Sequence, residues 1–244
     1  MQVRFERKAL NVGAGPTLLL WFESNGLHRH FRVALFFFLF VITKQTLRKE
    51  LLAARRTLRP AARAHAALQV ADFIGHTRWL APGKRIGLYA SMPQELGTSP
   101  LIALARERGC EIYLPRITSL QSRRMRFVRL NPRARRHSFG MIEPEGHEWL
   151  GARFLDTIFV AGVGFDRHGA RLGHGAGFYD RALAFRRIRN HWRGPRLVGL
   201  AYAFQVVPHI PVTATDVLMD YIVTDRGIDE LLADEDGAVD LRSR

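Results

Sequence analysis

Apolar residues recur at helical spacing near residue 50. Four of them follow one another at intervals of four, three and four positions: Leu47, Leu51, Ala54 and Leu58. This repeat places side chains on one face of a helix. Thr43 is the expected N-cap and Pro60 the expected stop, because proline cannot continue a helix. We therefore predict an amphipathic helix over 43–59. We expect its other face to be solvated, with the cations Lys44, Arg48, Lys49, Arg55, Arg56 and Arg59.

Further along, short apolar runs alternate with helical patterns. The runs predict strands over 85–90, 111–114, 125–130, 156–161, 196–202 and 221–224, and the helical patterns cover 61–74, 99–108 and 179–187. Strands separated by helices favour an α/β fold with a mostly parallel sheet and helices on both faces, a three-layer α/β/α and Rossmann-like arrangement. Ligands of such sheets bind beyond the carboxyl ends of the strands.

Residues 1–43 differ in composition from the rest. Their run 31–42 is apolar but shorter than the ~20 residues that span a bilayer. Arg29 and Arg32 precede it, as in a signal peptide, yet no small-residue cleavage site follows. Three interpretations stay open: a mis-assigned start, which we favour, an uncleaved membrane-associating segment, or an extra packed element.

The other end of the chain is acidic. From Asp225 onward seven acidic residues face three arginines, which predicts a loosely docked tail. We divide the chain into an N-terminal extension (1–43), a main domain (44–231) and an acidic tail (232–244).

The strongly positive charge of the chain raises the alternative of a nucleic-acid-binding protein. The net charge is +15, and eight arginines but no acid fall between Arg116 and Arg136. No RNA-reading aromatic motif interleaves this cluster, and it could serve an anionic small molecule equally well. The single cysteine, Cys110, excludes an intramolecular disulfide. We expect it to be a partly buried small hydrophobe, compatible with a reducing, cytoplasmic setting.

Candidate chemistry gathers after the apolar run 158–161. Four glycines lie between this run and the next predicted helix: Gly169, Gly173, Gly175 and Gly177. Such a turn can bring main-chain N–H groups to a phosphate at a helix start. The P-loop motif is excluded because no lysine follows Lys84, and the dinucleotide motif fails because position 178 is Phe. From spacing alone, an anion-binding loop and a plain glycine-rich connection both stay open.

A resemblance extends this interpretation. The stretch RLGHGAGFYD at 171–180, called the glycine loop below, resembles the signature loop of the 5-formyltetrahydrofolate cyclo-ligase family. KQTLR at 44–48 resembles the family's N-terminal basic motif, and SMPQE at 91–95 its substrate-side segment. The three stretches occur in the family's order. The long loop is specific, whereas the short motifs are weak alone.

The resemblance implies an ATP-dependent ligase that cyclises 5-formyltetrahydrofolate to 5,10-methenyltetrahydrofolate and releases ADP and phosphate. The expected ligands are the folate, ATP as co-substrate and Mg²⁺. No obligatory protein partner or nucleic acid is expected, and membrane contact only through residues 1–43 if that segment is real. Two alternatives remain: a basic nucleic-acid-binding protein, and a catalytically idle relative.

The resemblance also implies residue roles. ATP-binding positions are Lys44, Gln45, Thr46, Leu47, Arg48, Arg171, Leu172, Gly173, His174, Gly175, Ala176, Gly177, Phe178 and Tyr179. Substrate-binding positions are Ala90, Glu95, His174, Gly175, Ala176, Gly177 and Phe178. Arg171 and His174 are the catalytic candidates, although His174 departs from the Arg or Met of the family. Asp180 and Asp216 match magnesium ligands.

Each acidic candidate also has a structural interpretation. Asp180 could balance a helix dipole, Asp216 could cap a following helix, and Glu95 could be a solvent-exposed turn residue. Asp166, beside the glycine loop, is expected to be a turn residue rather than a base.

Overall fold

The structure is a computed structural model of the chain. It describes residues 5–10, 18–23, 43–130, 148–188, 194–229 and 231. Contacts divide the chain into two compact units, Met1–Ile42 and Thr43–Arg244. In the first unit, β1 (Phe5–Leu10) and β2 (Leu18–Glu23) form an antiparallel pair. The apolar run 31–42 and the tail 232–244 lie outside the described residues, and the three-part division of the chain stays a prediction.

Within the described part of the chain, no helix combines the length and the apolar character that a bilayer span requires.

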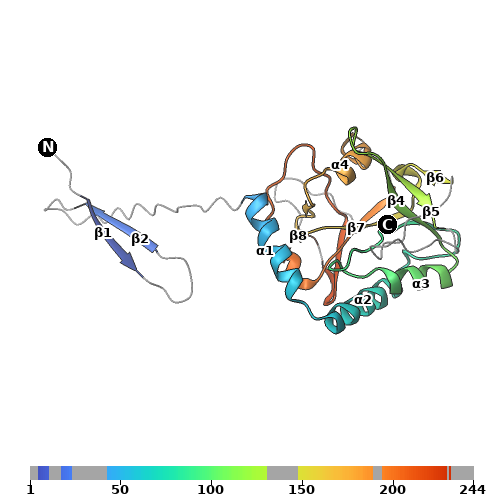
Figure 1. The fold of residues 1–244 in the computed structure, drawn as a ribbon, viewed down its shortest axis with the longest axis horizontal. Helices are drawn as coiled ribbons and strands as arrows, with labels where there is room; N and C mark the ends of the chain where they lie inside the picture. Colours follow the sequence, from blue (N-terminus) through green and yellow to red (C-terminus); the bar gives the residue numbers. More distant parts are fainter. Residues whose placement is uncertain are drawn as a thin grey trace. The chain divides into compact units, whose positions relative to one another are not determined.

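An eight-stranded sheet forms the centre of the second unit (Figure 1). Its spatial order is β13 (Gly227–Asp229), β12 (Tyr221–Thr224), β10 (Arg196–Leu200), β7 (Thr157–Ala161), β3 (Arg85–Gly87), β4 (Glu111–Ser119), β5 (Arg124–Arg129) and β6 (Trp149–Leu150). The five strands from β12 to β4 are parallel, and antiparallel strands close both edges. The predicted mostly parallel sheet is confirmed.

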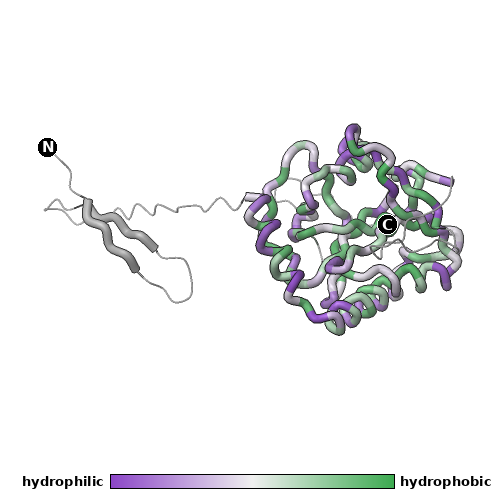
Figure 2. The backbone as a smooth tube through the Cα atoms, in the orientation of Figure 1, coloured by the Kyte–Doolittle hydropathy of each residue, from purple (hydrophilic) through white to green (hydrophobic). Residues whose placement is uncertain are grey.

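Helices cover both faces of this sheet. On one face, α2 (Pro60–Gly75) and α3 (Ser99–Glu107) lie side by side, and their buried residues share a core with Ile86 and Phe159. On the other face, η1 (Ala152–Phe154), α4 (Phe178–Ala182) and α5 (Phe185–Ile188) cover a second core that contains Ile158 and Val160. Because successive strand residues point to opposite faces, β7 supplies both cores. Figure 2 shows the resulting hydrophobic strands at the centre of the unit.

A third, smaller core joins α1 (Lys44–Thr57) to the rest. Leu47 and Leu51 of α1 pack with Leu172 in a cluster beside a three-stranded sheet. That sheet has the order β11 (Val206–Val207), β8 (Gly164–Asp166) and β9 (Arg171–Leu172). Asp166 is 1% exposed and accepts hydrogen bonds from the backbone N–H groups of His168, Ala170 and Ile210. It is therefore a turn organiser, as expected.

The order in which successive strands are added to the sheet reverses between β3 and β7, although these two strands are parallel. From β3 it proceeds outward through β4, β5 and β6, and it returns at β7 on the other side of β3 before continuing to β10 and β12. Neighbouring parallel strands that lead away in opposite directions leave a crevice beyond their carboxyl ends. The segments after β3 and β7 are those that hold the predicted substrate motif and the glycine loop.

Four local predictions need correction. Pro60 begins α2 as well as ending the first helix pattern, since proline fits the first turn of a helix. The predicted strand 111–114 continues to Ser119 and forms a long hairpin with β5. The predicted helix 179–187 is divided at Leu183, which is 1% exposed and packs in the second core between α4 and α5. Residues after Asp225 form the edge strand β13, because Ile228 pairs with Val223 instead of fraying.

Arg55 is a fifth correction. It was expected on the solvated face of the first helix, but it is 2% exposed. It follows Leu51 by four positions, so it lies on the buried side of α1. Cys110, in contrast, is partly buried against the first core as expected.

Candidate active site

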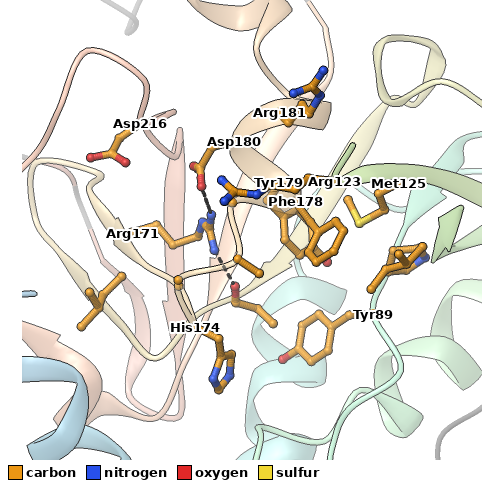
Figure 3. A pocket seen from close by; sticks show the side chains of 18 of the residues that line it. Tyr89, Arg123, Met125, Arg171, His174, Phe178, Tyr179, Asp180, Arg181 and Asp216 are labelled. Atoms are coloured by element: carbon orange, nitrogen blue, oxygen red, sulfur yellow. Dashed lines mark hydrogen bonds and ion pairs between the residues drawn. The ribbon is translucent and has the colours of Figure 1, made fainter. Parts of the chain in front are cut away.

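A cavity of about 1310 Å³ lies beyond the carboxyl ends of the central strands. Its walls come from the start of α1, the segment after β3, the β4–β5 hairpin, the glycine loop with α4, and the segment before β12 (Figure 3). Of the predicted site residues it contains Lys44, Arg48, Ala90, Glu95, Arg171, Leu172, Gly173, His174, Gly175, Ala176, Gly177, Phe178, Tyr179, Asp180 and Asp216. Three members of the first motif do not line it. Gln45 and Thr46 are exposed on α1, and Leu47 is buried in the third core.

The beginning of α1 is fixed at one side of this cavity. The Thr43 hydroxyl accepts a hydrogen bond from the Thr46 N–H at 3.2 Å, so the predicted N-cap is confirmed. In the next position, Lys44 Nζ lies 2.6 Å from Asp216 Oδ2. The cap and the ion pair together hold the Lys44 ammonium at the cavity.

Asp216 closes its own turn. Its Oδ2 accepts from Thr213 N–H at 2.7 Å, and no helix follows it, so the interpretation as a helix cap is wrong. Partial burial acts to raise the pKa of this carboxyl, but the hydrogen bonds from Lys44 and Thr213 outweigh burial and hold the pKa below its usual value. Asp216 is therefore an ionised, partly exposed carboxylate.

The glycine loop is held open by its backbone conformation. Gly175 has φ +100° and Gly177 has φ +70°, values that other residues adopt only with strain. Arg48 Nε donates to the Gly173 carbonyl at 2.8 Å, which ties the loop to α1. His174, Gly175 and Ala176 are exposed at the turn. The loop thus presents main chain and the His174 ring to the cavity.

Arg171 and Asp180 pair across the base of this loop. Arg171 Nη2 lies 3.1 Å from both carboxylate oxygens of Asp180, while Nη1 donates weakly to the Ala161 carbonyl at 3.4 Å. The guanidinium also lies 5.3 Å from the centre of the Tyr179 ring. Since the Arg171 side chain is only 7% exposed, Asp180 is its main counter-charge. Asp180 stands in the first turn of α4, but this ion pair is its dominant contact.

Glu95 lies deeper than its sequence context indicates. It is 8% exposed, and its Oε2 accepts from the Met92 N–H at 3.0 Å. Its Oε1 lies 3.6 Å from His174 Nε2 and 3.9 Å from Arg55 Nη2. The interpretation of Glu95 as a solvent-exposed turn residue is therefore wrong.

Several cavity residues were missed by sequence reasoning. They are Tyr89 and Met92 after β3, and Pro115, Arg116, Ile117, Arg123 and Met125 in the β4–β5 hairpin. In Figure 3 the rings of Tyr89, Phe178 and Tyr179 lie away from Asp180 and Asp216. Burial raises the pKa of the Tyr89 and Tyr179 hydroxyls, with a further contribution from the nearby Glu95 carboxylate, so both stay neutral. Met92, Pro115, Arg116 and Ile117 follow predicted strands, and that position was the available signal.

Positive charge dominates the cavity wall. Seven cations line it, Lys44, Arg48, Arg116, Arg123, Arg171, Arg181 and Arg187, against the carboxylates of Glu95, Asp180 and Asp216. This excess suits a polyanion. Within the Arg116–Arg136 cluster, Arg126 instead lies 3.7 Å from the centre of the Trp149 ring, and Arg129 pairs with Glu111. The described arginines of the cluster therefore divide between the cavity and the outer strands.

The carboxylates could hold a magnesium ion only together with a ligand. In the described parts of the chain no three His, Cys, Asp or Glu side chains come together as a metal site. Asp180 and Asp216, however, line the same cavity, with side chains 27% and 20% exposed. One or two carboxylates that complete a shell of phosphate oxygens and waters are the arrangement that Mg²⁺ prefers. The donor set fits that ion.

Comparisons with known proteins agree with this geometry. A sequence model described as the 5-formyltetrahydrofolate cyclo-ligase family matches residues 41–225. The 5-formyltetrahydrofolate cyclo-ligase of Mus musculus is 33% identical over 190 residues, which cover 74% of this chain and 92% of the mouse protein. That of Haemophilus influenzae is 35% identical over 147 residues, 57% of this chain and 75% of the relative. The solved structure of Aquifex aeolicus 5,10-methenyltetrahydrofolate synthetase is similar with a TM-score of 0.65 and 28% identity, covering 82% of this chain and 99% of that chain.

Proposed function

This chain belongs to the 5-formyltetrahydrofolate cyclo-ligase family, and from that premise we propose how its cavity carries out the family's reaction. The enzyme converts 5-formyltetrahydrofolate to 5,10-methenyltetrahydrofolate in an ATP-dependent ligase reaction. The observation that carries the assignment to this cavity is the meeting of all three family motifs at its wall. These motifs lie far apart in the sequence.

The chemistry explains the need for ATP. A formamide oxygen is a poor leaving group. Transfer of the γ-phosphoryl group to this oxygen gives ADP and a phosphorylated formyl group. The neighbouring amine of the folate then attacks the formyl carbon, forms the new C–N bond and loses its proton, while the C–O bond breaks and inorganic phosphate leaves. Such a reaction requires mainly positioning and positive charge around the phosphates.

We assign the triphosphate to the polar side of the cavity. Lys44, Arg48 and Arg171 supply positive charge there, and the open backbone of the glycine loop supplies N–H donors. Arg48 already holds the Gly173 carbonyl at 2.8 Å, so it can position the loop as well as contact phosphate. Arg171 is our candidate for the cation that stabilises charge on the transferred group. His174, opposite Glu95, borders the formyl group in this arrangement.

The magnesium ligands are part of the same proposal. Asp180 and Asp216 would hold the ion together with ATP phosphates, each releasing its present cation toward the nucleotide. When bound, Mg²⁺ neutralises the phosphate charge that builds up during transfer. In its absence, Lys44 and Arg171 are the groups that pair with these two carboxylates and hold them in place.

The folate would occupy the less polar side. Glu95 provides a buried acceptor for the N–H donors of the pterin, and Ala90 lines the cavity from the same segment after β3. Tyr89, Phe178 and Met125 offer apolar surface to the rings. Residues 174–178 separate the two ligands, which is where the reacting groups must meet. We further propose a cytoplasmic setting, consistent with the partly buried thiol of Cys110.

A direct test is the absorbance of the methenyl product. We expect purified protein to form it from 5-formyltetrahydrofolate only when both ATP and magnesium are present, because the oxygen must be phosphorylated before it can leave. Omitting ATP, and separately adding a chelator of magnesium, are the controls. Product formed at the same rate without ATP would contradict the proposal.

A further inference from the structure

Arg55 is a buried cation outside the cavity. Its side chain is 3% exposed, and its Nε donates to the Gln94 carbonyl at 3.0 Å. Of the described residues, only Arg55 Nη1 and Arg171 Nε are buried side-chain nitrogens or oxygens without a hydrogen-bond partner. Burying a guanidinium with one N–H group unpaired is unfavourable, and an apolar side chain would avoid that cost. We infer that the positive charge of Arg55 has a function beyond packing.

The nearest opposite charge is Glu95. Arg55 Nη2 lies 3.9 Å from Glu95 Oε1, the oxygen that also lies 3.6 Å from His174 Nε2. Glu95 lines the cavity and Arg55 does not, so the carboxylate stands between the buried cation and the ligand space. Attraction to this cation favours one orientation of a carboxylate that is only 8% exposed.

The backbone around Glu95 has two anchors besides the hydrogen bond from Arg55 to the Gln94 carbonyl. Arg63 Nη1 donates to the Pro93 carbonyl at 2.7 Å, and the Tyr202 hydroxyl donates to the Glu95 carbonyl at 3.0 Å. The segment 92–95 therefore keeps these two anchors when Arg55 is replaced. Arg63 provides a matched comparison, because it contacts this segment through the Pro93 backbone carbonyl rather than through the Glu95 carboxylate.

We propose that Arg55 is a positioning residue for the folate. It holds the Glu95 carboxylate in position at the cavity wall, so that Glu95 can accept hydrogen bonds from N–H donors of the pterin. The inference rests on the proposed folate side of the cavity. It adds a residue of α1, outside the ligand contacts, to the determinants of substrate affinity.

A double-mutant cycle on Arg55 and Glu95 tests this role. The variants are Arg55→Met, Glu95→Gln and both together, with Arg63→Met and the exposed Arg56→Met as controls. Each is characterised by KM for 5-formyltetrahydrofolate, KM for ATP and melting temperature. We expect Arg55→Met and Glu95→Gln each to raise the folate KM by at least about tenfold and to change the ATP KM by less than about twofold. The double variant should match Glu95→Gln, because Arg55 acts through that carboxylate.

The two Michaelis constants separate positioning from simple loosening. A general loosening of the fold would lower the melting temperature and change the KM for both substrates, whereas loss of a contact that positions Glu95 changes the folate KM alone.

Two results would overturn the proposal. One is a double variant whose folate KM exceeds that of Glu95→Gln by about tenfold, because Arg55 would then act independently of Glu95. The other is an Arg63→Met variant that reproduces the folate effect of Arg55→Met. If Arg55→Met alone fails to fold, the comparison of Glu95→Gln with the double variant still decides, since the double variant has no unpaired buried charge. Failure of wild-type protein to turn over the folate would contradict the proposed function instead.

Discussion

Two carboxylates of the cavity are each held by a cation, one distant in the sequence and one in the same loop. Asp216 pairs with Lys44, and Asp180 pairs with Arg171. From the sequence, each acid had a metal-binding and a structural interpretation. Ion pairing adds a third function, because each acid neutralises a cation that would otherwise repel the other cations of an empty cavity. The proposed metal-binding role requires these pairs to open.

Replacing Asp180 with Asn tests this double function. The variant keeps the shape but leaves the largely buried Arg171 without its counter-charge, so we expect the free energy of unfolding to fall by roughly 1–3 kcal/mol. If Asp180 also binds magnesium, turnover should fall at least about tenfold, equivalent to about 1.4 kcal/mol in the barrier. Added magnesium should restore part of the lost turnover. Turnover against magnesium concentration and melting temperature are measured together. Normal turnover with an unshifted magnesium curve would remove Asp180 from the metal site.

Acid stability tests the Lys44–Asp216 pair. The pKa of Asp216 lies below its usual value, so the folded state binds the proton less readily than the unfolded chain does. The stability from this group is therefore fully present above the unfolded pKa of about 3.9 and is lost as pH falls through the lower folded pKa. We expect Asp216→Asn to melt below the wild type at neutral pH, and the difference to shrink as pH falls below about 4 and to vanish once pH lies below the folded pKa. A constant difference down to the lowest accessible pH would contradict this origin.

At the scale of elements, contact between β8 and β10 depends on glycine. Gly199 of β10 faces Phe165 of β8, and a Cβ at position 199 would lie 2.4 Å from the Phe165 ring. We expect Gly199→Ala to lower the free energy of unfolding by roughly 1–3 kcal/mol, because the buried ring must shift in a packed core. Gly75→Ala in α2 is the matched control. There the nearest atom would be a Leu104 methyl at 3.4 Å, and we expect a change below about 1 kcal/mol. Equal unfolding midpoints in urea for both variants would refute the packing explanation.

The pattern of apolar residues was sufficient to predict most elements but not their partners. Strands β7, β10 and β12 lie where apolar runs predicted them, since buried parallel strands are continuously apolar. The β4–β5 hairpin was missed as a unit because its outer half contains exposed arginines and has no two-residue turn motif. Its cavity residues could therefore not be assigned to the site.

Within the site, the motifs predicted many of the residues that line the cavity but not all of them, and burial had to come from the fold. Arg55 and Arg56 are adjacent arginines in the sequence, yet Arg56 is exposed and Arg55 is only 2% exposed. Its spacing of four from Leu51 was a signal, but a cation on an apolar face conflicts with the usual cost of burying charge. Only the position of Glu95, brought close by the segment after β3, explains it.

At the scale of the whole molecule, the unit Thr43–Arg244 contains every residue of the proposed site. We expect deletion of residues 1–42 to leave turnover and melting temperature largely unchanged, because Thr43 still caps α1. Thr43→Ala in the full chain should cost about 1 kcal/mol. Turnover and thermal melting of both proteins check these expectations. A folded truncation without activity would show that the first unit takes part in the reaction.

The pairing of Lys44 with Asp216 also has a consequence during synthesis. The two residues are 172 positions apart, so the cavity wall stays incomplete on the ribosome until position 216 has emerged. Contacts of such sequence separation form late, because the intervening chain must first be ordered. ATP and folate can therefore stabilise the nascent protein only at the end of translation. Until then, the buried strands and the cations of α1 depend on local packing, or on chaperones, for protection from aggregation.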